Sequence, residues 1–147
     1  MTFEMSNSNR SDVIRLELPA THQYLNVLTD SIGAFLSHLE GMRSDNEVLQ
    51  KIQLAIHEAC TNIVNHSYDG EVGEIVITMT LSYDPRWFAV ELLDQGYNSF
   101  DMSDAVKPNM DDAQIHGYGL YIIEELMDDM LYIPEPGNNY WRLVKLL

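Results

Sequence analysis

Two side chains able to handle a proton or a metal ion lie four residues apart in one apolar-periodic stretch. Glu58 carries a carboxylate and Asn62 a neutral amide, and residues four apart lie on the same face of a helix. His66 would extend this polar row by one more turn. Such a row on an otherwise buried helix is costly unless a polar group faces it. We therefore expect the row to face a polar ligand.

Two short glycine-containing segments complete the set. Asp94-Gln-Gly96-Tyr-Asn98 follows a strand-like run and places an acid and a glycine where that run ends. Gly117-Tyr-Gly119-Leu120 opens a helix, and its two glycines allow backbone N–H groups to approach an anion at the helix N-terminus. None of the three segments alone is specific evidence for a nucleotide site. Their order and context together predict a nucleotide site.

The first half of the chain must position the polar row. Residues 13–18 alternate between apolar and polar types, which predicts a strand. Thr21 is placed to cap a helix that runs to about Glu40 and is ended by Gly41. Asp45 is placed to cap a second helix over residues 48–65, which carries the row.

The second half is predicted to supply most of the sheet. In order it reads as a hairpin of strands 74–82 and 86–93, a helix over 117–130, and strands 131–134 and 140–147. Residues 97–116 are polar and lack a period, and a connection of that length inside a compact domain is usually functional or disordered. The order of elements predicts an α+β fold, a two-layer sandwich with helices on one face of a mixed, mostly antiparallel sheet. We assign residues 12–147 to one domain and residues 1–11 to a flexible tail.

The three segments resemble the N, G1 and G2 boxes of the GHKL ATPases. The likeness is strongest to the anti-sigma factor serine kinases, through Glu58-Ala-Cys-Thr-Asn62, His66-Ser-Tyr68 and the helix that starts at Gly117-Tyr-Gly119. The resemblance runs from about Ser11 to the C-terminus. It implies the Bergerat sandwich, with residues 97–116 as the ATP lid.

The resemblance also implies a role for each site residue, with ATP and Mg²⁺ as cofactors. Glu58 would act as the catalytic base toward a serine hydroxyl, and Asn62 would bind Mg²⁺. Asp94 would accept a hydrogen bond from the adenine amine, with Gly96 letting the base lie close. The remaining nucleotide-binding positions would be Asn98 beside the base and, near the phosphates, Gly117, Gly119 and Leu120.

Two positions depart from the family pattern. Asn98 stands where a second glycine is expected, and the Asn138-Asn139 pair lies where the family often has threonine. The expected lid also carries four aspartates, Asp101, Asp104, Asp111 and Asp112, against His116 and Lys107 as positive charges. A negative lid is an awkward neighbour for ATP.

Composition narrows the classes of partner. The 147 residues include 8 Lys and Arg against 23 Asp and Glu, for a formal charge of −15. A nucleic-acid binder needs a basic surface, so direct nucleic-acid binding is not expected. An acidic surface suits solubility or a basic protein partner. The single cysteine, Cys60, reads as a buried filler and allows no internal disulfide. No apolar run is long enough to span a membrane, so we expect a cytoplasmic protein.

The resemblance implies an ATP-binding anti-sigma factor that sequesters a sigma factor and phosphorylates an anti-anti-sigma partner on serine. The resemblance implies a homodimer, and we expect it to form through the 13–18 region. Two alternatives stay open: a partner-binding module of the same fold with weak or no kinase activity, and a GHKL-type ATPase unrelated to sigma factors. The intact Glu58 and Asn62 favour the kinase, whereas Asn98 and the acidic lid favour the alternatives.

Overall fold

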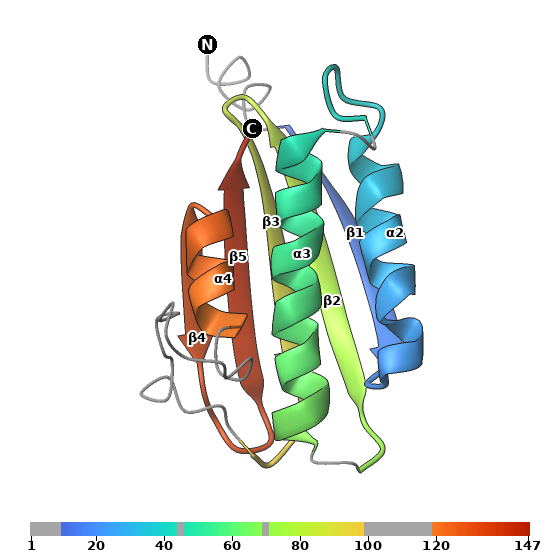
Figure 1. Cartoon of the computed structure of the whole chain (residues 1–147), viewed down its shortest axis with the longest axis vertical. Coiled ribbons are helices and arrows are strands. Elements are labelled where there is room, and N and C mark those ends of the chain that lie inside the picture. Colours follow the sequence, from blue (N-terminus) through green and yellow to red (C-terminus); the bar gives the residue numbers. More distant parts are fainter. Residues whose placement is uncertain (1–9, 44–45, 69–70, 99–118) are drawn as a thin grey trace, which may run out of the picture.

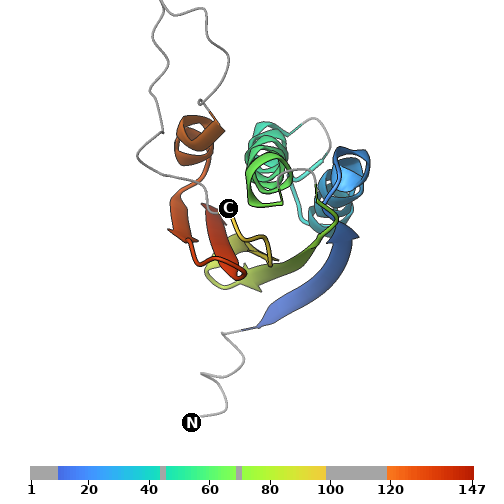
Figure 2. The same ribbon diagram turned by 90° about the horizontal axis from the view of Figure 1, so that it is seen from below.

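The structure, a computed structural model, describes residues 10–43, 46–68, 71–98 and 119–147. Within these residues, three α-helices lie side by side across one face of a five-stranded sheet (Figure 1). Viewed from one end, the sheet curves beneath the helices, and its other face carries none of the described helices (Figure 2). The predicted α+β sandwich is therefore confirmed.

The sheet is built from β1 (Ser11–Pro19), β2 (Glu74–Tyr83), β3 (Arg86–Asp94), β4 (Asp129–Ile133) and β5 (Asn139–Leu146). The strand order is β1-β2-β3-β5-β4, and each neighbouring pair is antiparallel. We expected a mixed, mostly antiparallel sheet, and the described strands are antiparallel throughout. β3 pairs with β5 in the interior of the sheet, so the end of β3 at Asp94 lies beside the start of β5 at Asn139.

The helical layer begins with a 3-10 turn, η1 (His22–Tyr24), that leads into α2 (Leu25–Leu36). The central helix, α3 (Glu47–Asn62), continues into a π-helical turn, η2 (Ile63–Ser67). The last helix, α4 (Gly119–Leu126), packs beside α3. The order of helices and strands matches the prediction, and the differences lie at the ends of elements.

The ends of the first two helices differ from those predicted. α2 stops at Leu36 instead of Glu40, and the chain then turns through Gly41, whose φ is +84°. The cap of α3 is Asn46, whose Oδ1 accepts hydrogen bonds from the N–H groups of Val48 at 2.7 Å and Leu49 at 3.2 Å. The predicted cap, Asp45, lies outside the described residues. Both side chains are good helix caps, so the sequence did not separate them.

The last helix is also shorter than predicted. It ends at Leu126 instead of about Met130, because the backbone N–H of Asp128 already bonds to the carbonyl of Val144 on β5 at 2.9 Å. The following residues alternate sides as a strand does. Tyr132 stacks on Trp141 with ring centroids 4.2 Å apart, so sheet pairing decides where this helix ends.

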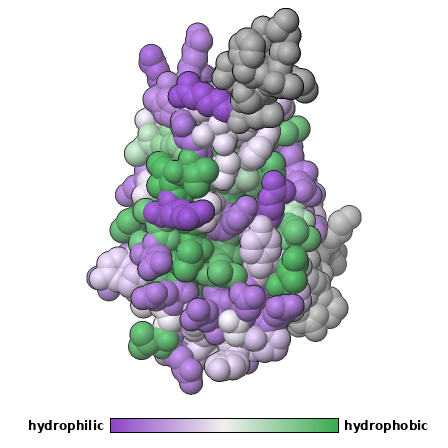
Figure 3. All heavy atoms as spheres, turned by 180° about the vertical axis from the view of Figure 1, so that it is seen from behind, coloured by the Kyte–Doolittle hydropathy of each residue, from purple (hydrophilic) through white to green (hydrophobic). Residues whose placement is uncertain are grey.

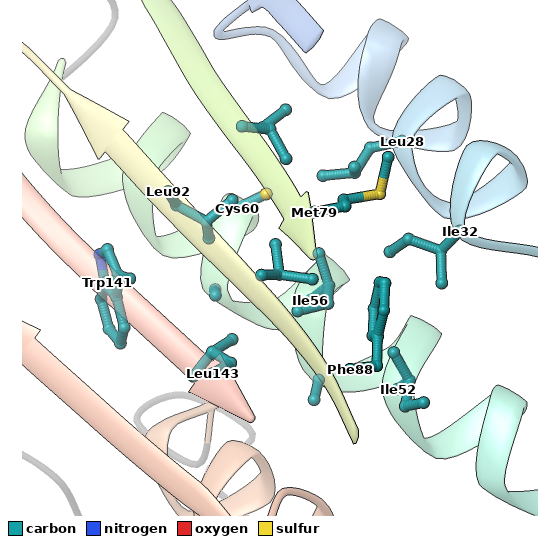
Figure 4. Packing of buried hydrophobic residues seen from close by; sticks show 14 of the residues in the cluster. Leu28, Ile32, Ile52, Ile56, Cys60, Met79, Phe88, Leu92, Trp141 and Leu143 are labelled. Atoms are coloured by element: carbon teal, nitrogen blue, oxygen red, sulfur yellow. The ribbon is translucent and has the colours of Figure 1, made fainter. Parts of the chain in front are cut away.

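The core fills the space between the sheet and the helices (Figure 4). Phe88 and Trp141 rise from the sheet toward α3, where Ile56 and Cys60 are fully buried. Burial raises the pKa of the Cys60 thiol to about 12, which leaves it protonated and unreactive at neutral pH. The expectation that Cys60 is a buried filler is confirmed.

The opposite face of the sheet mixes apolar and polar surface (Figure 3). Alternation along each strand directs every second side chain to this side, and Leu131, Ile133 and Leu146 are between 44% and 64% exposed. Among the described helices, none is both long and apolar enough to cross a membrane.

Candidate nucleotide site

The candidate site lies where α3, the end of β3 and the start of α4 come together (Figure 1). Gly119 begins α4 directly against the polar row of α3. A Cβ built on Gly119 would lie 3.2 Å from Oε2 of Glu58 and 3.5 Å from Oδ1 of Asn62. The absence of a side chain at this position therefore lets the start of the helix face both polar side chains.

Asn62 has an unusual hydrogen-bonding state. Its Nδ2 is buried, yet it has no hydrogen-bond partner among the described residues. A buried amide nitrogen without a partner costs about 1–3 kcal/mol, so the group is suited to a polar ligand. Together with the half-buried Glu58, it offers one amide and one carboxylate. This small oxygen donor set fits Mg²⁺, which keeps most of its ligands as water and phosphate oxygens.

The π-helical turn η2 changes the geometry expected after Asn62. The N–H of Tyr68 bonds to the carbonyl of Ile63, five residues earlier, at 3.4 Å. This wider turn rotates the following residues around the helix axis. His66 is exposed, so it does not extend the buried part of the row. Ser67 is buried and points toward the end of β3 instead.

Asp94 is fully buried at the end of β3. Its Oδ1 accepts hydrogen bonds from the N–H of Gly96 at 3.0 Å and from Nδ2 of Asn139 at 3.1 Å. Its Oδ2 accepts a longer bond, 3.3 Å, from the hydroxyl of Ser67. Burial raises the pKa of the carboxyl above its usual value, and the three donors oppose that effect. A carboxylate held in this way keeps acceptor capacity at Oδ2 for a further donor.

The turn formed by residues 94–98 requires glycine at position 96. A Cβ on Gly96 would lie 2.3 Å from the backbone oxygen of Ser67, which no side chain can tolerate. The same oxygen accepts a bond from the N–H of Asn98 at 3.3 Å, and the carbonyl of Gly96 accepts one from Gly137 at 2.9 Å. The Asp94–Asn98 turn is thus clamped between η2 and the turn that precedes β5.

Asn139 is a residue of this site that the sequence analysis named only as part of a departure from the family pattern, without a role in the site. It is fully buried, and its Nδ2 lies 3.1 Å from Asp94 Oδ1 and from the carbonyls of Gly96 and Asn98. The register pairs it directly with Asp94 across β3 and β5. Counting that register back from the two strands would have found it. Ser67 carried no comparable signal, because its position depends on the π turn.

A pocket of 610 Å³ opens beside the turn, and residues 67–68, 71–74 and 95–98 line it. Tyr68 borders it and braces the turn, since its hydroxyl accepts a bond from the N–H of Gln95 at 2.9 Å and donates to the carbonyl of Glu74 at 2.6 Å. The pocket reaches Gly96 and Asn98 but not Glu58 or Asn62. The pocket therefore lies beside the 94–98 turn, and the polar row of Glu58 and Asn62 does not line it.

The remaining predicted positions divide into two groups. Leu120 directs its side chain into the core and is 1% exposed, which leaves its backbone as the part able to face a ligand. Gly117, Lys107 and His116 lie outside the described residues, as does most of the expected lid. Among the residues that are described, no group of three or more His, Cys, Asp or Glu side chains could hold a metal ion.

Comparison with known proteins agrees with this geometry. A sequence model of the histidine kinase-like ATPase domain matches residues 18–145. The serine-protein kinase RsbW of Bacillus cereus strain G9842 is 33% identical over 137 residues, which cover 87% of this chain and 81% of that protein. RsbW of Bacillus thuringiensis subsp. konkukian strain 97-27 is 32% identical with the same coverage.

Solved structures share the fold at lower sequence identity. The crystal structure of the RsbU and RsbW domains of Rv1364c from Mycobacterium tuberculosis superposes with a TM-score of 0.66 and 20% identity, covering 92% of this chain and 32% of that chain. A histidine kinase domain from Erythrobacter litoralis EL346 gives 0.54 and 15%, over 88% of this chain and 62% of that one. The fold, the site and the sequence relatives together establish that the chain belongs to the GHKL (histidine kinase-like) ATPase family, in the group of serine-protein kinases that includes RsbW.

Proposed function

We propose that the protein binds ATP with Mg²⁺ and transfers the γ-phosphoryl group to a serine of a small anti-anti-sigma protein. The protein would also bind and sequester a sigma factor. The observation that carries this proposal is the position of Glu58 and Asn62 against the glycine start of α4. An intact row of this kind at a helix N-terminus suits phosphoryl transfer, in which positioning and charge stabilisation supply most of the catalysis.

The nucleotide would be held from both ends. At the base, Oδ2 of Asp94 would accept a hydrogen bond from the adenine amine, and Gly96 and Asn98 would line the turn beside it. At the phosphates, backbone N–H groups at Gly119 and Leu120 would donate to anionic oxygens. Gly117 would extend this contact from the lid side.

The chemistry would be divided between two side chains of α3. The carboxylate of Glu58 would take the proton from the attacking serine hydroxyl. This makes the serine oxygen a stronger nucleophile as it approaches phosphorus. Asn62 would hold Mg²⁺, which when bound would neutralise charge on the phosphates. The unpaired Nδ2 of Asn62 is a hydrogen-bond donor, and it supports an acceptor such as a phosphate oxygen at this point.

The departure at Asn98 does not weaken the case for a kinase. Its backbone N–H bonds to Ser67 and its carbonyl accepts from Asn139, so the turn is held through the main chain and not through a second glycine. An intact turn supports the kinase over the alternative of a partner-binding module with weak or no kinase activity. The charge of −15 supports a basic surface on the sigma-factor partner, and such a partner would place the protein in the cytoplasm.

The proposal is tested by phosphoryl transfer. Purified protein is incubated with γ-labelled ATP and each small protein that copurifies with it, and labelled products are mapped by mass spectrometry. We expect label on one serine of a partner. If nucleotide binds tightly but no partner acquires label, the protein is a binding module. Failure to bind ATP or ADP would refute the nucleotide site itself.

Replacing Asn62 with alanine is expected to weaken ATP binding about tenfold when Mg²⁺ is present and to have little effect in EDTA. The amide would be lost as a metal ligand, whereas the contacts at the base would stay. Calorimetric titrations with and without Mg²⁺ measure the difference. Asn65→Ala serves as the control, since Asn65 is exposed and bonds to His22 at the surface. An equal loss in both buffers would exclude Asn62 from metal binding.

We also propose that the chain forms a homodimer through β1. The carbonyl of Arg10 accepts a bond from the N–H of Tyr83, and the register pairs Ser11 with Ser82. In an antiparallel ladder, alternate residues bond to the partner strand, so even-numbered residues of β1 face β2. The N–H of Val13 therefore points to the outer edge, where no described strand pairs with it. Val13 itself is 51% exposed.

Replacing Val13 with proline is expected to convert the dimer to a monomer. Proline removes the outward N–H and leaves the bonds between β1 and β2 intact. Light scattering coupled to size-exclusion chromatography measures the mass at several concentrations. Val13→Thr keeps the N–H and the β-branched shape, and we expect it to stay dimeric. A dimeric Val13→Pro protein with an unchanged dissociation constant would place the interface elsewhere.

A further inference from the structure

We propose that Asn139 is a positioning residue for nucleotide recognition, because its side-chain amide fixes the carboxylate of Asp94 and the main chain of the 94–98 turn in one arrangement. The inference rests on the proposed role of that turn in binding adenine. Asn139 itself would not contact the nucleotide. It would act through the groups that do.

The geometry around Asn139 is that of a cross-link between two turns. Its Nδ2 lies 3.1 Å from each of three acceptors: Oδ1 of Asp94 and the carbonyls of Gly96 and Asn98. Its Oδ1 accepts a bond from the N–H of Glu135, also at 3.1 Å. One buried side chain therefore ties the turn before β5 to the first, third and fifth residues of the 94–98 turn.

The chemistry of this position favours an amide. The three groups facing Nδ2 are all acceptors, so the side chain must donate, while the N–H of Glu135 requires an acceptor on the same side chain. Asparagine is the short side chain that offers two N–H donors and a carbonyl oxygen. An aspartate of the same size would set a carboxylate against a second carboxylate and two carbonyls. Alanine would leave three buried acceptors without this donor.

Asp94 is the group through which the effect would reach the nucleotide. The donors that contact its carboxylate are the Ser67 hydroxyl, the Gly96 N–H and the Asn139 amide, and none of them carries a charge. Burial raises its pKa, so Asp94 takes up a proton at a higher pH than an ordinary aspartate. Because the protonated form is a poorer acceptor, ADP affinity of the unmodified protein should fall as pH falls.

The test uses Asn139→Asp, with ADP titrated calorimetrically between about pH 8 and about pH 5.5. At the upper pH the two facing carboxylates repel, and we expect ADP to bind at least about tenfold more weakly than to the unmodified protein. As pH falls, the pair shares a proton, and the protonated carboxyl can donate in place of the amide. ADP affinity of the variant should therefore rise as pH falls, whereas that of the unmodified protein should not.

Asn138→Asp is the matched control. Asn138 is exposed in the same turn, so this variant adds an identical charge one residue away without facing Asp94. We expect it to keep the affinity and the pH slope of the unmodified protein. If Asn139→Asp also keeps that slope, Asn139 does not position Asp94 and the inference is overturned.

A second variant covers the case in which Asn139→Asp does not fold. Asn139→Ala adds no charge, and we expect at least about a tenfold loss in the ratio of ADP to GDP affinity. A purely structural defect would lower both affinities and leave their ratio unchanged, which would overturn the inference. The unmodified protein separates the two proposals. If it binds no adenine nucleotide, the proposed function fails; if it binds and the Asn139 variants match it, only the role of Asn139 fails.

Discussion

Phosphoryl transfer should fall by about 10²- to 10⁴-fold when Glu58 is replaced with glutamine, with little change in ATP affinity. Glutamine keeps the size and nearly the helix propensity of glutamate, but its amide cannot accept the proton of the serine hydroxyl. The side chain lies against Gly119 at the surface of the site, so the substitution does not disturb the core. Rates with labelled ATP, compared with affinities from calorimetry, separate chemistry from binding.

The control for this experiment is Glu47→Gln, which removes one carboxylate from the exposed first turn of the same helix. It lowers the negative charge equally but lies far along α3 from Gly119. We expect its transfer rate to match that of the unmodified protein. If Glu58→Gln also transfers phosphate at the unmodified rate, the proposed base is wrong. A loss of ATP affinity equal to the loss of rate would assign Glu58 to binding.

The layered fold could be predicted because its signals are local and repeated. Alternation of apolar residues in β2 and β3 and the Asp84-Pro85 turn between them define a hairpin. The 3.6-residue period in α2 and α3 sets their buried faces. Element ends were less accurate, because a helix stops where the backbone finds other partners. Asp128 bonding to β5 is one such case.

The candidate site was predictable in its parts and less so in its assembly. Glu58, Asn62, Asp94 and Gly96 could be named from type and spacing. The π turn after Asn62 has no periodic signature, so the position of Ser67 beside Asp94 could not be predicted from the sequence. Asn139 depends on strand register, a contact between residues 45 positions apart.

Replacing Asp94 with asparagine is expected to weaken ADP binding about 10- to 150-fold, or roughly 1.5–3 kcal/mol. The charged acceptor for the adenine amine would be lost. The new amide would also have to place one of its polar atoms against the Nδ2 of Asn139, which now donates to Oδ1. A carbonyl oxygen in that place keeps this bond and turns an N–H₂ group toward the base, where adenine presents a donor.

The same substitution tests selectivity between bases. Guanine carries a carbonyl oxygen where adenine carries its amine, so the Asp94 carboxylate should repel guanine, whereas the asparagine amide should donate a hydrogen bond to it. We therefore expect the unmodified protein to prefer ADP and Asp94→Asn to lose or reverse that preference, as measured by paired titrations with ADP and GDP. Asp129→Asn, at the exposed start of β4, removes a charge elsewhere and should change neither affinity. Equal affinities for ADP and GDP in the unmodified protein would remove Asp94 from base recognition, because a buried carboxylate that faced the base could not treat an amine and a carbonyl alike.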